Sequence, residues 1–392
     1  MKLLLFATHP IQYQAPWFRA LAVHPEIDLT VAFGMLPSAE EQAVGFDVAF
    51  EWDLPLLDGY RSIQLELAAG RRSISSFRGI RVRNLDAVLE REVADLVLVT
   101  GWNSWMLVQA ANAAKRRGIP LIVRGESNDL RRRPAGVRWL QRRFLARFDA
   151  CLAIGSANRR FLEARGIAPE RIFDTPYFVD NARFVDAAAK LEGQREGIRN
   201  RWSIPSSLLC VLFAGKLIPK KRPLDVVRAV AVAREAGADL HLLIAGDGEL
   251  REATESACRA AAIPSTFAGF LNQTQIPEAY SAADLLALPS DAGETWGLVV
   301  NEAMASGRPA LVSREVGSAE DLVLANRTGW THELGDTDAM AERLVEASHA
   351  PDRLLPMGAL AKAHVVENFS VDRAVEGTVR ACRSALAGRG GG

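Results

Sequence analysis

The chain has 392 residues, with 47 Lys plus Arg and 47 Asp plus Glu. A chain of this length predicts two domains rather than one core. The balanced charge leaves no global positive field that would indicate a nucleic-acid partner. A hydrophobic fraction of 49% and a charged fraction of 24% are typical of a soluble globular protein.

The cysteines and the N-terminal run point to a reducing compartment. Four cysteines lie far apart, in neither a metal-ligand nor a disulfide spacing, and are expected to be small core residues. The opening "MKLLLFATHP" is too short for a signal peptide and predicts a buried first strand. No apolar stretch approaches the roughly 20 residues of a membrane span. A cytoplasmic location is expected. Peripheral contact with the inner surface of the membrane is a second hypothesis that is compatible with it.

Short apolar runs alternate with helix-period segments along the whole chain. Strands are predicted at 2–8, 28–34, 95–100, 120–125 and 150–155, and then at 207–215, 238–246, 265–270, 284–290 and 308–314. Helices are predicted between them, for example at 15–24, 84–93 and 105–118. Continuous apolar strands separated by helices indicate an α/β fold with parallel sheets covered on both faces.

The alternation breaks once, in a polar helical stretch, which places a linker at 191–206. Two doubly wound, Rossmann-like domains are therefore expected at 1–190 and 207–370. A C-terminal helix that crosses back to the first domain, followed by a flexible tail, is expected at 371–392. Ligands of such sheets bind at the carboxyl ends of strands, so a cleft between the two halves is the expected site.

A basic loop follows the first strand of the second half. In "FAGKLIPKKRP" the strand ends at Gly215, and Lys216 and Lys221 precede a helix. Cations beside a helix N-terminus at a strand end suit a diphosphate. The alternative interpretation is a solvated basic loop with no ligand.

Two glutamates flank a predicted helix at 298–305 that is apolar nearly all round. Glu294 lies in the loop before it and Glu302 more than one turn inside it. A buried carboxylate needs a donor, and ribose hydroxyls would supply one. A buried ion pair or a bond to backbone is the structural alternative for Glu302.

At this point four motifs carry a family resemblance. They are G-K-L-x-P-K-K at 215–221, G-D-G-E-L at 246–250, the Y-x-x-A-D run at 280–284, and "ETWGLVVNEAMASGRP" at 294–309. In this order they look like glycosyltransferase family 4, whose members are retaining, metal-independent sugar transferases with the GT-B fold. The resemblance covers residues 207–330, and the two glutamates are its most specific part. The first domain is similar mainly in organisation.

The resemblance implies roles for residues of the second domain in binding a nucleotide-sugar donor. Lys216, where the family usually has arginine, and Lys221 correspond to residues that bind the donor diphosphate. Glu294 resembles the glutamate that contacts hydroxyls of the donor sugar, and Glu302 the one that holds the ribose. The remaining donor-binding residues implied by the motifs are Gly215, Phe270 and Leu271 beside the base, and Trp296, Gly297, Leu298 and Val299 near the phosphates and sugar.

The implied reaction is hexosyl or related sugar transfer, with retention, from a nucleotide sugar, with a UDP-sugar as the expected donor. No cofactor and no metal are expected, because the donor is a co-substrate and two lysines with a helix N-terminus stabilise the leaving diphosphate. The acceptor is a sugar, a lipid-linked or a small molecule, bound by the first domain. A nucleotide-sugar 2-epimerase of the same fold and a non-catalytic sugar-nucleotide-binding protein are the competing hypotheses.

The first domain departs from the family pattern at two strand ends. The usual glycine-rich turn after the first strand is replaced by a polar loop, and a histidine that the family often has after the fourth strand is absent. Glu126 stands near that second position and is a candidate base or acceptor ligand. Candidates for the sugar or the acceptor in these two loops are His9, Gln12, Tyr13, Gln14, Arg124 and Asn128. Capping of the first helix by His9 and Gln12 is the structural alternative.

Residues 130–148 hold seven arginines interleaved with aromatic and aliphatic side chains. A basic amphipathic helix of this kind can lie on an anionic membrane. A solvated helix with one face on its own core is the simpler interpretation. Binding of an acidic acceptor by the arginines is a third.

Overall fold

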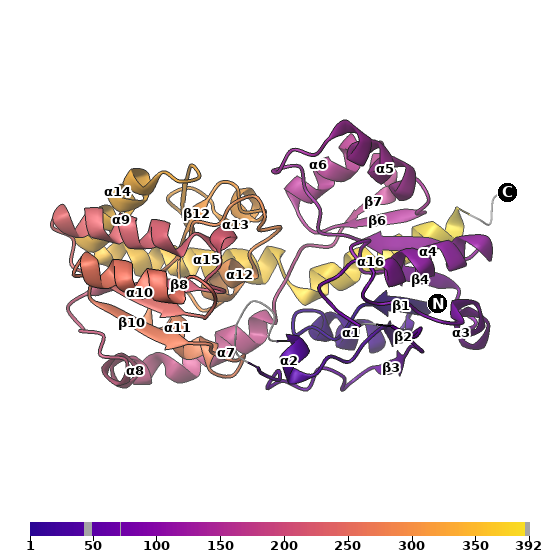
Figure 1. The fold of residues 1–392 in the computed structure, drawn as a ribbon, viewed down its shortest axis with the longest axis horizontal. Coiled ribbons are helices and arrows are strands. Elements are labelled where there is room, and N and C mark those ends of the chain that lie inside the picture. Colours follow the sequence, from indigo (N-terminus) through magenta and orange to yellow (C-terminus); the bar gives the residue numbers. More distant parts are fainter. Residues whose placement is uncertain (43–48, 71, 389–392) are drawn as a thin grey trace. The chain divides into compact units, whose positions relative to one another are not determined.

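The structure is a computed structural model that describes residues 1–42, 49–70 and 72–388. The chain folds into two compact units (Figure 1). Unit 1 contains residues 1–42, 55–177 and the C-terminal segment that begins at Val371, and unit 2 contains residues 49–54 and Phe178–Ser370. The division falls after Tyr177, earlier than the boundary expected at residue 190. A short piece from the first half of the sequence also belongs to the second unit.

Unit 1 is a parallel sheet with helices on both faces. Its strand order is β3 (Arg61–Gln64), β2 (Asp28–Phe33), β1 (Lys2–Ala7), β4 (Leu96–Val99), β5 (Leu121–Arg124), β6 (Ala150–Ala153) and β7 (Ile172–Asp174). The helices are α1 (Ala15–Ala22), α2 (Ala39–Gln42), α3 (Leu85–Glu92), α4 (Trp105–Arg116), α5 (Ala135–Leu145), α6 (Ser156–Ala164) and α16 (Val371–Ala387), with a 3-10 turn at Pro169–Arg171. The central strands are buried almost throughout, as expected for a parallel sheet covered on both sides.

Unit 2 repeats this plan. Its strand order is β10 (Ser265–Gly269), β9 (Leu240–Ala245), β8 (Leu209–Ala214), β11 (Leu285–Leu288), β12 (Ala310–Ser313) and β13 (Gly329–His332), again all parallel. The helices are α7 (Asn181–Leu191), α8 (Arg195–Arg201), α9 (Pro223–Glu235), α10 (Arg251–Ala260), α11 (Ile276–Ala282), α12 (Leu298–Ala305), α13 (Ala319–Leu322), α14 (Thr337–His349) and α15 (Leu354–Asn368), with 3-10 turns at Glu192–Gln194, Pro219–Lys221 and Pro351–Arg353.

Each strand predicted from an apolar run is present, whereas three edge strands were not predicted. β3, β7 and β13 are three or four residues long. β3 is partly exposed along its whole length, so it lacks the continuous apolar pattern on which the prediction rested. Edge strands of this kind are defined by a neighbouring strand rather than by their own composition.

The stretch expected to be a linker, residues 191–206, is a docked part of unit 2. Arg195 and Arg199 both form ion pairs with Asp284 at the start of β11, the second at 3.1 Å. Asp284 also accepts a hydrogen bond from the backbone N–H of Cys210, at 2.7 Å. The polar character of this stretch therefore reflects ion pairs that hold α8 against the sheet.

The C-terminal helix α16 belongs to unit 1, as expected. A Cβ on its Gly377 would lie 2.0 Å from the carbonyl oxygen of Asp174 in β7, so glycine is what allows the helix to approach that strand. The side chain of Arg383 binds Glu26, which follows α1. The tail expected to be flexible is described only as far as Gly388, and residues 389–392 lie outside the described part of the chain.

Both sheets reverse their strand order at one point, between β1 and β4 in unit 1 and between β8 and β11 in unit 2. Ligands of doubly wound sheets bind beyond the carboxyl ends of the strands at this reversal. In unit 2 the loops in question begin at Gly215 and at Pro289. These are the loops that contain the lysines and the first glutamate of the sequence motifs.

Candidate functional site

The loop after β8 is built around close backbone contacts. Gly215 has φ +138°, a conformation that L side chains rarely adopt. A Cβ on Gly246, at the end of β9, would lie 1.9 Å from the carbonyl oxygen of Gly215. A Cβ on Gly215 itself would lie 3.6 Å from Nζ of Lys221. Glycine at both positions therefore allows the ends of β8 and β9 to approach each other closely, next to the ammonium group of Lys221.

Lys221 and Glu294 form an ion pair of 2.5 Å between Nζ and Oε2. The two side chains are 11% and 13% exposed, so this pair is largely screened from water. The loops that carry them are also joined through backbone, because Asp291 N–H donates to the carbonyl oxygen of Lys220 at 2.9 Å. The structure thus places a cation and a carboxylate together at the sheet reversal, a direct pair that the motifs did not specify.

Lys216 is half-buried beside the same loop. Burial, followed by the positive charges of Lys220 and Lys221, lowers the pKa of Lys216 below its ordinary value. The direction of this shift shows that the ammonium is held where its charge is unfavourable. A bound anion would reverse that effect.

The N-terminus of α12 opens toward this loop region. Gly297 precedes the helix with φ +90°, and a Cβ there would lie 2.9 Å from Val316 and 3.0 Å from Leu288. The next N–H groups, those of Leu298 and Val299, are in the first turn, where an α-helix offers no carbonyl partner of its own. Both residues are only partly buried. The helix N-terminus therefore follows directly on the loop that carries Glu294, and the N-terminus of a helix is a position that favours anions.

Glu302 is 2% exposed inside α12. Its Oε2 accepts a hydrogen bond of 2.6 Å from the hydroxyl of Tyr280 in α11. The Tyr280 hydroxyl thus contacts this buried carboxylate, an interaction that the sequence did not indicate. Tyr280 belongs to the Y-x-x-A-D run, whose Asp284 binds Arg195 and Arg199. The run therefore supplies one buried hydrogen bond and one partly buried set of ion pairs.

The side chain of Trp296 is part of the core rather than of a surface. It is 2% exposed, donates through Nε1 to Oδ1 of Asn301 at 2.8 Å and lies 5.9 Å from the ring of Phe369. Its carbonyl oxygen accepts from the N–H of Ser318 at 3.1 Å. Any contact of Trp296 with a nucleotide-sugar donor would therefore use its backbone. Its side chain packs in the core and anchors the loop before α12.

The loop after β10 is covered by a segment from the first half of the sequence. The ring of Phe50 lies 4.4 Å from that of Phe270. The Asn272 side chain donates to the carbonyl oxygen of Glu51 at 2.6 Å, and Asp53 accepts from the N–H of Thr274 at 3.0 Å. Leu271 is partly exposed within the same loop. Residues 50–53 thus form one wall of the region where the base was expected, and no local pattern in the sequence indicated this.

In unit 1, Arg124 at the end of β5 is 2% exposed and lies between two aromatic rings. Its Cζ is 5.3 Å from the ring centroid of Trp17 and 4.6 Å from that of Tyr177. The hydroxyl of Tyr177 donates to Oε1 of Glu126 at 2.5 Å. Burial and the nearby Glu126 carboxylate raise the pKa of Tyr177 well above its ordinary value, so the phenol stays protonated and remains the donor.

The polar loop after β1 is largely buried. Gln12 and Gln14 are 8% and 7% exposed, and their Oε1 atoms have no hydrogen-bond partner within the described residues. Neither His9 nor Gln12 caps α1, since the N-cap residue is Gln14 and no side chain caps it. His9 lies 3.0 Å from Thr8 Oγ1, and burial lowers the pKa of His9 to about 4.

The other two candidates of unit 1 differ in their surroundings. Tyr13 is partly exposed in the β1–α1 loop. Asn128 accepts from the N–H of Leu130 at 3.2 Å and is buried, which gives its side chain a role in shaping its own loop. The loops after β1 and β5 therefore contain the buried guanidinium of Arg124 and the Glu126 carboxylate, which is hydrogen-bonded to Tyr177. They also contain the amide oxygens of Gln12 and Gln14.

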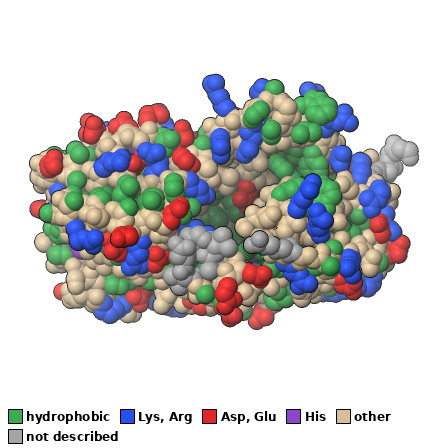
Figure 2. Space-filling model, viewed as in Figure 1, with side chains coloured by type: hydrophobic (Ala, Val, Ile, Leu, Met, Phe, Trp, Pro, Cys, Tyr) green, Lys and Arg blue, Asp and Glu red, His purple; other side chains and the backbone are tan. Residues whose placement is uncertain are grey.

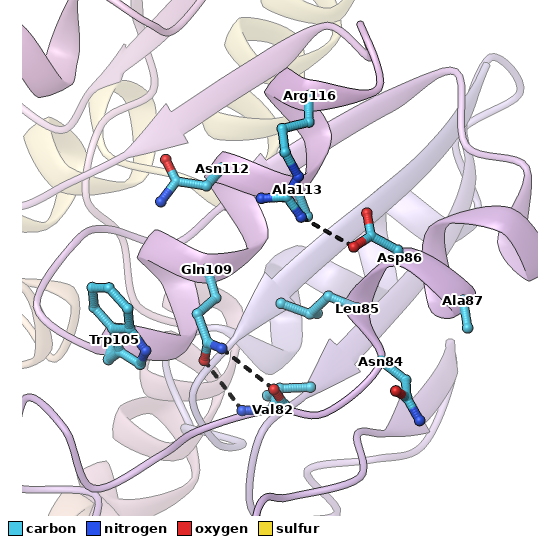
Figure 3. Close-up of a pocket in the computed structure, with 10 residues that line it drawn as sticks. All are labelled: Val82, Asn84, Leu85, Asp86, Ala87, Trp105, Gln109, Asn112, Ala113 and Arg116. Carbon is cyan, nitrogen blue, oxygen red and sulfur yellow. Dashed lines mark hydrogen bonds and ion pairs between the residues drawn. The ribbon is translucent and has the colours of Figure 1, made fainter.

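A separate hollow of about 580 Å³ lies between α3 and α4 of unit 1 (Figure 3). The Gln109 side chain there bonds to both backbone groups of Val82, at 3.2 and 3.3 Å, and Arg116 pairs with Asp86 at 3.0 Å. It contains none of the predicted site residues. We do not assign a ligand to it.

Comparison with known proteins now identifies the family. Residues 30–177 match the family described as "Glycosyl transferase 4-like domain", and residues 194–363 match "Glycosyl transferases group 1". The chain belongs to glycosyltransferase family 4. The two matches fall one in each unit for most of their length, so the first unit is matched as well, although its motifs depart from the family pattern.

Curated relatives of this glycosyltransferase act on several substrates according to their names. The GDP-mannose-dependent monoacylated alpha-(1-6)-phosphatidylinositol monomannoside mannosyltransferase of Corynebacterium glutamicum is 25% identical over 350 residues, which are 87% of this chain and 86% of that protein. The D-inositol 3-phosphate glycosyltransferase of Streptomyces scabiei is 32% identical over 203 residues, 49% of this chain and 45% of that protein.

Solved structures confirm the expected fold of the glycosyltransferase. A glycosyltransferase from Rickettsia africae matches with a TM-score of 0.73 at 14% identity, covering 98% of both chains. Anabaena Alr3699/HepE in complex with UDP matches with a TM-score of 0.73 at 16% identity, covering 98% of this chain and 100% of that one. The two parallel-sheet, Rossmann-like units are those of the GT-B fold.

Proposed function

We propose that this glycosyltransferase transfers a sugar, with retention, from a nucleoside-diphosphate sugar bound by unit 2 to an acceptor bound by unit 1. One observation supports this most directly. The Lys221–Glu294 pair, with 2.5 Å between Nζ and Oε2, lies at the strand-order reversal of unit 2. A charged pair in that position suits a ligand with an anionic group next to hydroxyls.

The diphosphate is the proposed ligand of the lysines. Lys221 and Lys216 would bind its oxygens together with the N–H groups at the start of α12. Cleavage of the bond between the anomeric carbon and the phosphate leaves negative charge on the diphosphate, and these donors stabilise that charge as it develops. A bond from the acceptor oxygen forms on the same face of the sugar, and the acceptor proton passes to the departing phosphate oxygen.

This arrangement supplies positive charge from the chain itself, which is why we propose a metal-independent reaction. Activity is expected to be the same in EDTA as in added Mg²⁺. Loss of activity on chelation, with recovery on adding the metal, would contradict the proposal.

Glu294 and Glu302 have separate proposed roles. When the diphosphate binds, Lys221 would interact with it as well as with Glu294. The Glu294 carboxylate would then accept hydrogen bonds from sugar hydroxyls. Glu302, oriented by the Tyr280 hydroxyl at 2.6 Å, would accept from the ribose hydroxyls. The base would lie at the backbone of Phe270 and Leu271.

We propose a UDP-sugar as the donor, supported by the HepE structure of the same fold, which is a complex with UDP. GDP-mannose is the second candidate, because it is in the name of the Corynebacterium glutamicum relative described above. Thermal shift against a panel of nucleoside-diphosphate sugars separates them. A ligand at about 100 times its Kd adds roughly 2.7 kcal/mol to the free energy of unfolding, so the true donor should raise Tm clearly above the others.

For the acceptor we propose the loops after β1 and β5 of unit 1. Glu126, held by Tyr177 at 2.5 Å, would bind an acceptor hydroxyl or amine, and Arg124, Gln12 and Gln14 would complete the polar surroundings. Tyr177→Phe removes the hydrogen bond to Glu126 without removing the carboxylate. It is expected to raise KM for the acceptor while leaving donor affinity unchanged, whereas an altered donor Kd would contradict this assignment.

The decisive test is an assay of nucleotide release with and without an acceptor library. Glycosylated product of retained anomeric configuration is expected only when an acceptor is present. A new sugar epimer formed from the donor alone would replace this proposal with the isomerase. Undiminished biological activity of a Glu294→Gln, Lys221→Ala double variant would replace it with a non-catalytic binding protein.

A further inference from the structure

The arginine-rich segment 130–148 forms an exposed surface on unit 1. Every residue from 131 to 140 is exposed, including the first half of α5. Trp139 is 57% exposed and Leu140 61%. Figure 2 shows hydrophobic and basic side chains together over the part of unit 1 where Figure 1 draws α5.

The apolar side chains of this surface are not needed to hold α5 in place. The helix is anchored at its other end by Leu145, which is fully buried, and by the Phe144 ring, 5.3 Å from that of Phe148. Gln141 adds a hydrogen bond of 3.0 Å from Arg165. The simpler sequence interpretation, one face on the core, therefore accounts for one end of the helix and leaves Trp139 and Leu140 unexplained.

The charge of the segment is one-sided. It contains seven arginines and no acidic residue. The flanking carboxylates are already engaged, because Asp129 binds Arg165 through both oxygens and Asp149 accepts from the N–H of Leu121 at 2.8 Å. Within the described residues, the segment's arginines form no ion pair: Arg131, Arg132, Arg133, Arg138, Arg142, Arg143 and Arg147. The positive charge is thus available to a partner.

Basic and apolar groups share the outward side of the helix. Cζ of Arg143 lies 5.0 Å from the ring centroid of Trp139. A tryptophan ring beside guanidinium groups suits the boundary between acyl chains and anionic headgroups, where the ring enters the interface and the arginines meet phosphates. Within the described residues, no helix is both long and apolar enough to span a membrane, so any membrane contact through these helices would be peripheral.

We propose that residues 130–143 dock unit 1 on an anionic lipid surface, with Trp139 and Leu140 inserted at the interface and the arginines bound to headgroups. The proposal concerns binding alone and does not depend on the donor or on turnover. Binding to such a surface should strengthen with anionic lipid content and weaken with salt. Because both kinds of side chain contribute, charge and insertion are separately testable.

The experiment is vesicle flotation of the full chain without donor or acceptor. Strong binding is expected to vesicles with roughly 30% anionic phospholipid, a composition on the order of natural cytoplasmic leaflets, and little to purely zwitterionic ones. Removing one arginine, in Arg131→Gln or Arg143→Gln, should lower partitioning roughly fivefold. A Trp139→Ser, Leu140→Ser double variant should lower it at least about tenfold.

Leu355→Ser and Arg327→Gln are matched controls, since both residues are exposed on unit 2 and should leave partitioning unchanged. Circular dichroism and Tm verify that each variant is folded. Binding to a soluble polyanion without binding to vesicles would overturn the proposal in favour of an acidic macromolecular partner. Equal binding of the Trp139→Ser, Leu140→Ser variant would overturn the insertion, and equal binding to both vesicle types would overturn the role of the arginines.

Discussion

The hydroxyl of Tyr280 donates a hydrogen bond of 2.6 Å to the buried carboxylate of Glu302. The two residues lie on adjacent helices, α11 and α12, and both are almost inaccessible to water. The bond orients the glutamate and offsets part of the unfavourable burial of its charge. It also gives the tyrosine of the Y-x-x-A-D run a role that its position in the motif did not specify.

Tyr280→Phe should therefore affect both stability and donor binding. The substitution removes the hydroxyl that donates to Glu302, so the free energy of unfolding is expected to fall by about 1–3 kcal/mol. Urea unfolding measures this. Glu302→Gln keeps an oxygen that can accept from Tyr280, so it should weaken nucleotide binding more than stability. The opposite ranking of the two variants would refute the assigned relationship.

Lys221 and Lys220 are neighbours with the same charge and different surroundings. Lys221 pairs with Glu294 at the strand-order reversal, whereas Lys220 is exposed and its Nζ lies 3.4 Å from the carbonyl oxygen of Gly293. Lys221→Ala is expected to lower kcat on the order of 10²–10³-fold, by analogy with oxyanion-hole donors. Lys220→Ala, the control, should change kcat by no more than a few-fold. Equal effects would show that only the net charge of the loop matters.

Gly246→Ala tests the close approach of the strand ends. The added Cβ would lie 1.9 Å from the Gly215 carbonyl oxygen, and relief of that clash requires backbone movement. We expect a loss of at least about 3 kcal/mol in the free energy of unfolding, or failure to fold. At Gly197, inside α8, a Cβ would meet nothing within 4 Å, so Gly197→Ala should be neutral or stabilising by up to about 1 kcal/mol. Denaturant unfolding distinguishes the two.

Phe50→Ala tests the wall that the first half of the sequence contributes to unit 2. Its ring packs 4.4 Å from Phe270, so its removal should loosen the loop proposed to hold the base. An aromatic pair is worth about 0.5–1.5 kcal/mol beyond its buried area, which predicts a several-fold weaker Kd for the nucleotide by calorimetry. Phe77→Ala, at a side chain 46% exposed in unit 1, should leave that Kd unchanged. An unchanged Kd in Phe50→Ala would remove this wall from the donor site.

The protein should lose stability in mild acid because of its buried histidines. Burial lowers the pKa of His9 and of His241 to about 4, below the unfolded value of about 6.5. Between these values the unfolded chain binds more protons, so stability rises with pH across this window and is lost as pH falls through it. A loss on the order of 1–2 kcal/mol per histidine is expected between about pH 6.5 and about pH 4.

Unfolding measured across that window checks the expectation. The slope should be smaller in His241→Gln, which keeps a side-chain amide to face Thr266, the present partner of His241 Nε2 at 2.9 Å. A slope unaffected by the substitution would assign the acid sensitivity to other groups.

The central strands of both sheets, the α/β class and the donor motifs were predictable from the sequence because each rests on local information. A continuous apolar run such as Lys2–Ala7 indicates a strand covered on both faces. The eight-residue spacing of Glu294 and Glu302 around a glycine separates a loop glutamate from a helical one. The two family matches and the GT-B neighbours then confirmed the fold that these patterns implied.

Only the tertiary structure showed which distant groups meet. The Tyr280–Glu302 bond joins residues 22 positions apart, and Asn272 bonds to Glu51 across 221. Nothing in the composition around residue 50 indicates that it packs on unit 2, because such contacts depend on the strand order of a sheet that forms elsewhere in the chain. The sequence likewise did not determine whether the Trp139 side chain is exposed. Periodicity describes a helix, whereas the neighbouring elements decide which of its side chains are left for a partner.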